Sequence, residues 1–122
     1  MVKKLLIFSF LLFPAFSSVA SSVKCSEKAT NIYFSKLMTY DSTLSALRGD
    51  NPSKLSETEI KIINDLISFC ERGVTDKDYN TDKLRDMMYE DFASNGSMSN
   101  EGAKKFADAL VNMYEYGVTI NK

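Results

Sequence analysis

Carboxylates and cysteines are the obvious candidates for chemistry in this 122-residue sequence, which contains sixteen Asp and Glu and two Cys. It contains no histidine, so it lacks the commonest general base and every Cys-His or Ser-His nucleophile. Two carboxylates about 5–9 Å apart can hydrolyse a glycosidic bond. Each Asp and Glu here is nevertheless explained as a helix cap or as part of a solvated helix surface. We therefore predict a binding protein with no catalytic residue, no metal ion and no cofactor.

One acidic segment partly matches a calcium loop. Residues 76–82 place oxygen-bearing side chains at positions 1, 3, 5 and 7 of such a loop. Position 6 is Thr81, where the loop needs glycine, and position 12 is Met87, where it needs a bidentate glutamate. We therefore expect a solvated acidic loop that caps the following helix.

Residues 1–20 have the pattern of a secretory signal peptide. Lys3 and Lys4 precede an apolar run over residues 5–16, and Ser18-Val19-Ala20 provide a small-residue exit. The run is shorter than the roughly 20 residues that span a bilayer, and it contains Pro14. We expect cleavage after Ala20 and an exported mature protein without a membrane span. Without the two leader lysines, 13 basic residues face 16 acidic ones, a formal net charge of −3.

Cys25 and Cys70 form an even pair in a small chain that is expected to be exported, and this favours a disulfide. No histidine, C-x-x-C motif or metal-ligand spacing accompanies them, so a reactive thiol is disfavoured. Closing their 45-residue separation would stabilise the fold by about 4 kcal/mol on the chain-entropy model. We expect the two cysteines to have a structural role.

The first amphipathic stretch ends before Gly49 and Pro52. Its apolar residues recur at steps of three and four, the spacing of one helix face. They are Cys25, Ala29, Tyr33, Leu37, Tyr40, Leu44 and Leu47. Because Asp41 and Ser42 are also good helix caps, this stretch is either one long helix or two helices with a kink near Thr39.

The second helix is predicted to begin at a capping box of Ser56 and Glu59 and to end at Gly73. Its apolar face consists of Ile60, Ile63, Leu66, Ile67 and Cys70. If the first two helices pair as an antiparallel hairpin, Cys25 and Cys70 lie at the same end and can be bridged.

Two further helices are predicted. The third carries Leu84, Met87, Met88 and Phe92 and stops before Asn95. Ser99 caps the fourth, whose end is predicted at Gly117. The apolar face of the fourth consists of Ala103, Phe106, Ala107, Leu110, Met113 and Tyr114. Apart from the short tail over residues 118–120, no strand pattern is present. We predict a single all-α domain over residues 21–122, a small bundle of four to five helices with one intrachain disulfide.

Residues for partner recognition are expected around the third and fourth helices. A helix buries only one apolar stripe, and the helices have more Met and Tyr than such a stripe requires. Tyr89 and Tyr116 therefore either project outward as contact residues or belong to a wide buried face. The connection between the two helices is small and polar, and it either only joins them or inserts into a cleft of another protein. It consists of Asn95, Gly96, Ser97, Met98, Ser99 and Asn100, preceded by Ser94.

Charge disfavours nucleic acid as the partner, because Lys104 and Lys105 are the only adjacent basic pair of an acidic mature chain. A protein partner remains by elimination. The leader, the helical domain, the pair Cys25 and Cys70 and the missing catalytic apparatus resemble the periplasmic immunity proteins of type VI secretion systems, especially those against lysozyme-like effectors. This resemblance implies a protein that binds a peptidoglycan-hydrolysing toxin and blocks its active-site groove, often as a homodimer.

The layout is also similar to that of the HdeA-like periplasmic acid-stress chaperones, which are helical and have two cysteines about this far apart. That resemblance implies exposure of apolar surface when acid neutralises the carboxylates. With 16 acids and 13 bases, the mature chain is strongly cationic at pH 2. Prevention of aggregation at pH 2 would favour this alternative, whereas tight binding of one muramidase at neutral pH would favour immunity.

Overall fold

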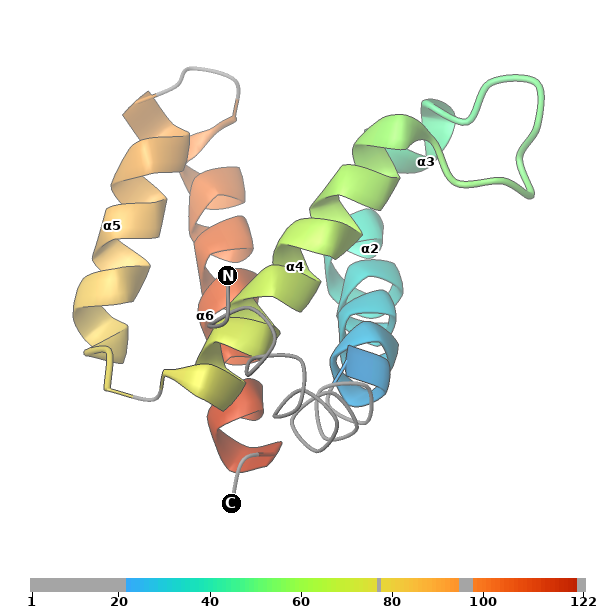
Figure 1. Cartoon of the computed structure of the whole chain (residues 1–122). Helices are drawn as coiled ribbons and strands as arrows, with labels where there is room; N and C mark the ends of the chain where they lie inside the picture. Colours follow the sequence, from blue (N-terminus) through green and yellow to red (C-terminus); the bar gives the residue numbers. More distant parts are fainter. Residues whose placement is uncertain (1–21, 77, 95–97, 121–122) are drawn as a thin grey trace, which may run out of the picture.

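The computed structural model describes residues 22–76, 78–94 and 98–120 (Figure 1). A helix over residues 22–32 continues into the π-helical turn η1 (Tyr33–Leu37) and α2 (Met38–Tyr40). The later elements are α3 (Thr43–Ala46), α4 (Glu57–Thr75), α5 (Thr81–Ser94) and α6 (Asn100–Ile120). No strand occurs in the described ranges. The predicted all-α fold is confirmed.

The first amphipathic stretch is divided at Asp41, and this decides between one helix and two. Asp41 leaves the helical region with φ −122° and ψ 92°. Its Oδ1 accepts hydrogen bonds from the backbone N–H and the hydroxyl of Thr43, at 3.1 and 2.6 Å, at the start of α3. Because the chain turns here, Tyr40 and Leu47 are exposed, whereas the other five residues of the predicted stripe are buried.

The predicted disulfide between Cys25 and Cys70 is confirmed. It joins the start of the helix over residues 22–32 to the last turns of α4, and both cysteines are completely buried. Their Cα atoms are 5.7 Å apart, within the normal range for a disulfide. The capping box is also present, since Ser56 and Glu59 exchange hydrogen bonds at the start of α4. The disulfide ties α4 to the continuous helix over residues 22–40, which we call the N-terminal helix, whereas the capping box fixes the start of α4.

Two glycines bring α4 and α6 into backbone contact. A β-carbon on Gly73 would collide with the carbonyl oxygen of Tyr114, and one on Gly117 would collide with that of Cys70. The prediction that these glycines end their helices is therefore wrong: α4 runs to Thr75, and α6 runs through the tail to Ile120. Their role is close helix approach, which the absence of a side chain permits.

Helix α5 packs differently from the others. Figure 1 shows it beside α6, on the left, with α4 and the N-terminal helix to the right. None of its residues is buried, and Met87, predicted on its apolar face, is 56% exposed. The ring centroids of Phe92 and Phe106 lie 6.2 Å apart, and Arg85 Nε lies 2.9 Å from Asp108 Oδ1. These contacts attach α5 to α6 at the edge of the bundle.

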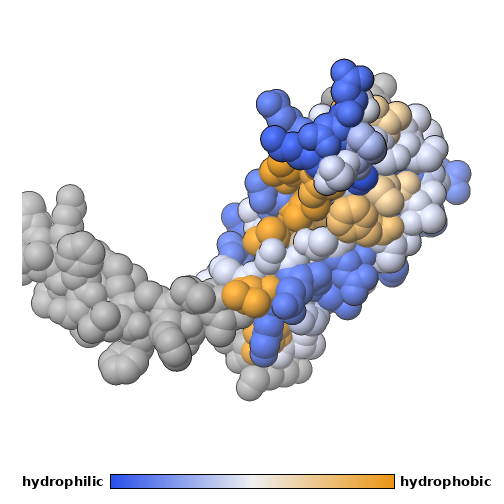
Figure 2. Space-filling model, turned by 90° about the vertical axis from the view of Figure 1, so that its right-hand side faces the viewer, coloured by the Kyte–Doolittle hydropathy of each residue, from blue (hydrophilic) through white to orange (hydrophobic). Residues whose placement is uncertain are grey.

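Figure 2 looks onto the right-hand side of Figure 1, where apolar side chains form a band between hydrophilic ones. Among these side chains, the guanidinium of Arg48 lies over the ring of Phe34, 5.9 Å from the ring centroid. Exposed large apolar residues of the N-terminal helix, the following loop and the start of α4 are Val23, Phe34, Leu47 and Ile60. The predicted apolar face of α4 is thus buried at Ile63, Leu66 and Cys70 but open at Ile60.

Candidate binding groove

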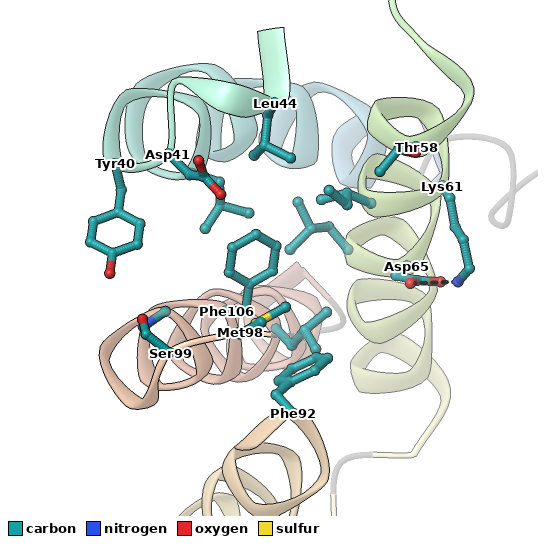
Figure 3. Close-up of a pocket in the computed structure, with 15 residues that line it drawn as sticks. Tyr40, Asp41, Leu44, Thr58, Lys61, Asp65, Phe92, Met98, Ser99 and Phe106 are labelled. Atoms are coloured by element: carbon teal, nitrogen blue, oxygen red, sulfur yellow. Dashed lines mark hydrogen bonds and ion pairs between the residues drawn. The ribbon is translucent and has the colours of Figure 1, made fainter. Parts of the chain in front are cut away.

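A half-open hollow of about 680 Å³ lies where five elements meet, and we call it the groove. Its volume is in the range of ligand pockets, roughly 300–1,000 Å³. The apolar lining residues are Leu37, Leu44, Ile62, Leu66, Phe92, Met98, Phe106 and Leu110. The others are Tyr40, Asp41, Thr58, Lys61, Asp65, Ser99 and Gly102. Figure 3 shows the ring of Phe106 in the middle of the groove, with Leu44 and Asp41 on one side and Phe92 on the other.

The groove results from helix ends that meet. At Asp41 the chain leaves one helix and enters α3, which brings Leu44 into the core beside Leu37. On the facing element, the hydroxyl of Ser99 accepts a hydrogen bond from the N–H of Gly102 at 3.0 Å and caps α6, as predicted. A β-carbon on Gly102 would lie 3.8 Å from Tyr40 Cε2, so the start of α6 approaches the Tyr40 ring closely.

The groove lining contains two acidic residues, Asp41 and Asp65, and one basic residue, Lys61. Lys61 Nζ and Asp65 Oδ2 lie 3.0 Å apart and form an ion pair. Within the described ranges Asp41 has no ion pair, and its two hydrogen bonds come from the neutral groups of Thr43. Lys105 lies close by, 5.3 Å from the centroid of the Tyr40 ring, but it lines a neighbouring hollow. The lining of the groove itself is therefore slightly acidic.

The residues predicted for partner recognition occupy three places. Met98 and Ser99 line the groove, and Asn100 is the exposed first residue of α6. Tyr89 lines a shallow hollow along α5, and Tyr116 lines another beside Lys28, whose Nζ is 5.2 Å from its ring centroid. Both tyrosines are half-buried, and Tyr116 packs against the core. Asn95, Gly96 and Ser97 lie outside the described residues, as does the predicted signal peptide.

Sequence reasoning did not find the groove itself. It assigned Tyr40, Leu44 and Phe106 to apolar stripes and Asp41 to a helix cap, and each assignment describes the local structure correctly except for the exposed Tyr40. What it could not supply is that these residues face one another. A stripe residue that falls on the last turn of a helix, as Tyr40 does, is the available signal, because a helix end leaves space beside it.

A charged network surrounds the buried Glu59, the residue that follows Thr58 of the groove lining. Glu59 is completely buried and accepts hydrogen bonds from Arg48 Nε and Nη2, at 2.9 and 3.0 Å, and from the hydroxyl of Tyr33. The N–H of Ser56 donates to it as well, at 3.0 Å. Arg48 also donates to the carbonyl of Pro52, at 3.1 Å. The loop before α4 is thus fixed to the N-terminal helix through one carboxylate.

The network shifts the acidities of its members. The hydrogen bonds from Arg48, helped by those from Ser56 and Tyr33, lower the pKa of Glu59 from 4.5 to about 2, against the opposing effect of burial. Burial and the bond to Glu59 raise the pKa of Tyr33 above its usual value. The same carboxylate raises the pKa of Arg48. Because all three hydrogen-bond partners stabilise the ionised form of Glu59, we assign the network to structure.

Two further properties bear on function. In the described part of the chain, no three His, Cys, Asp or Glu side chains gather in a position to hold a metal ion. Over the same residues, no helix combines the length and the apolar character needed to cross a membrane.

No family model, curated protein or solved structure matches this chain. The function is therefore inferred from the geometry and chemistry of the groove.

Proposed function

We propose that this protein is an exported immunity protein. In the periplasm it binds a cell-wall-degrading toxin delivered by a type VI secretion system and inhibits it by occluding its active-site groove. The observation that carries the proposal is the half-open apolar groove, which has Met98 and Ser99 in its lining at the connection between α5 and α6. Hollows with an apolar lining and a few polar groups are typical binding sites.

The disulfide supports the compartment in this proposal. Disulfides persist in oxidising compartments such as the bacterial periplasm, and Cys25–Cys70 is buried between two helices. The disulfide, the Glu59 network and the glycine contacts also join the N-terminal helix, α4 and α6 into a rigid platform. A rigid binder loses less conformational entropy on association, which favours tight inhibition.

Relief of toxicity tests the proposal directly. The full chain with its leader is co-expressed in the periplasm with the product of the neighbouring gene. We expect the chain to prevent lysis and the Cys25→Ser variant to protect less, because the unbridged fold is less stable. Lysis that continues in the presence of the folded wild-type protein would overturn the proposal. The resemblance to immunity proteins also implies a homodimer, which light scattering of the purified protein tests.

A charge at Met98 tests where the toxin binds. Met98→Lys is expected to weaken the binding of a catalytically inactive toxin about ten-fold or more in calorimetry, because it places an ammonium group in the apolar groove. Met87→Lys is the matched control, since Met87 is exposed on α5 and lines no part of the groove. Equal affinities for the two variants would assign the interface to another surface.

The acid-stress chaperone is the second candidate, and the buried Glu59 favours it. Protonation of this carboxylate near its pKa of about 2 removes the ionic link between Arg48 and the helices. Loss of that link would open the loop before α4 and expose apolar surface. Suppression of aggregation of unrelated proteins at pH 2, together with no binding of the toxin at pH 7, would select this function.

A further inference from the structure

We propose that the groove receives an apolar side chain of the toxin that stands next to a lysine or arginine on one protruding element. This inference rests on the proposed function and specifies which chemistry the groove recognises.

The apolar half of the inference follows from the lining. Leu37, Leu44, Leu66 and Leu110 are buried at the groove, and Phe106 stands in its middle. A side chain inserted there loses its water on several sides at once. Buried apolar surface stabilises a complex by roughly 25 cal/mol per Å², and such central, desolvated pockets carry most of the binding energy of an interface.

The position of α5 lets the groove accept such a group. Phe92 reaches the lining from α5, a helix with no buried residue, and it touches Phe106 edge to face. No buried residue of α5 has to move when Phe92 shifts. The opposite wall is firm, because Thr58 lies on α4 directly before the buried Glu59.

The basic half of the inference follows from charge. The ion pair of Lys61 and Asp65 is neutral as a unit, which leaves Asp41 as the charge of the lining that no cation balances within the described ranges. Figure 3 shows the Asp41 carboxylate directed toward the space above Phe106. The nearby Lys105 lies over the Tyr40 ring and contributes to the adjacent hollow instead. Complementarity therefore favours a cation beside the inserted apolar group.

Filling the groove tests the apolar half. Thr58→Trp places an indole at the groove from an exposed position on α4, and Asn64→Trp places one on the same helix away from the groove. We expect Thr58→Trp to weaken binding of the inactive toxin about ten-fold or more, and Asn64→Trp to change it less than about two-fold. Thermal unfolding followed by circular dichroism verifies that both variants are folded.

Removing one charge tests the basic half. Asp41→Asn keeps the oxygen that accepts from Thr43, so α3 retains its cap while the charge is lost. We expect an affinity loss of about three- to ten-fold and a weaker salt dependence than in the wild type. Asp86→Asn, an exposed position on α5 outside the groove, is the control and should bind like the wild type.

The results separate this inference from the proposed function. If the wild type binds the toxin but Thr58→Trp and Asp41→Asn bind equally well, the groove is not the site and only the inference fails. If only Asp41→Asn binds normally, the basic half fails. If the folded wild type does not bind the toxin at all, the proposed function fails and the inference fails with it.

Discussion

The crossing of the N-terminal helix, α4 and α6 differs sharply from the contact between α5 and α6. In the first region, which we call the closed region, backbones touch through Gly73 and Gly117, a disulfide bridges two helices, and the carboxylate of the buried Glu59 is hydrogen-bonded to Arg48. In the second, no residue of α5 is buried. Close packing and loose packing are thus separated in this fold. The closed region sets the stability, and the groove lies where closed packing gives way to open packing.

The largest effect is expected for Gly117→Ala. Its new β-carbon would overlap the carbonyl oxygen of Cys70, so α4 and α6 must separate, which also disturbs the Gly73 contact. We expect a loss of more than about 4 kcal/mol in the free energy of unfolding, measured by urea denaturation. Gly102→Ala is the control. Its nearest neighbour is the Ser99 hydroxyl at 3.3 Å, and we expect a change within about 1 kcal/mol.

The second-largest loss of stability is expected when the disulfide is removed. The double variant Cys25→Ser, Cys70→Ser loses a cross-link over a separation of 45 residues, worth about 4 kcal/mol on the chain-entropy model. Urea denaturation of the variant, and of the wild type with and without reductant, measures this loss. Equal midpoints in all three experiments would mean that the glycine contacts alone hold the closed region together.

Glu59→Gln is expected to cost about 3 kcal/mol. The variant leaves Arg48 without its anion, although the Arg48 side chain, 16% exposed, keeps some access to water. The buried amide also places an NH₂ group where only donors surround it. Glu57→Gln, at an exposed position two residues earlier, should be nearly neutral. Similar losses for the two variants would argue against a buried network.

Acid should weaken the closed region through the same carboxylate. The pKa of Glu59 is about 2 in the folded protein, below its usual value of 4.5. Its contribution to stability is therefore complete above pH 4.5 and is lost as the pH falls from 4.5 toward 2. Denaturation midpoints measured across this range should fall less for Glu59→Gln than for the wild type. Parallel curves would remove Glu59 as the cause.

The smallest effect is expected in α5. Met87→Ala should change the free energy of unfolding by less than about 0.5 kcal/mol, because Met87 is more than half exposed. Met113→Ala, in the completely buried part of α6, should cost about 3 kcal/mol through the cavity it leaves. These two methionines compare the regions with one change of side chain. Equal losses would show that α5 contributes to the core as much as α6 does.

Helix starts were predictable from the sequence because caps are local. Ser56 with Glu59, and Ser99 before α6, satisfy backbone N–H groups within three residues, so nearby sequence contains the whole interaction. The ends of α4 and α6 were not predictable in the same way, although α5 ends at Ser94, before Asn95, as predicted. Gly73 and Gly117 have the residue type of a helix end, but they serve a contact with a helix far away in the chain.

The candidate site was predicted only in part. Met98 and Ser99 were selected for their small, polar surroundings, and both line the groove. Tyr89 and Tyr116 were selected for their residue type and lie in other hollows. The burial of Glu59 was also missed, because a capping glutamate is usually at the surface and its second partner, Arg48, lies in a preceding loop.

The sequence by itself determined the helical class, the caps and the cysteine pair, since periodicity and local hydrogen bonding act over a few residues. The tertiary structure alone decided which stripe residues stay open, why two glycines lie inside helices and where Asp41, Phe106 and Met98 meet. The physical reason is distance along the chain. A groove is formed by helix ends that are remote in sequence, and packing of the whole bundle brings them together.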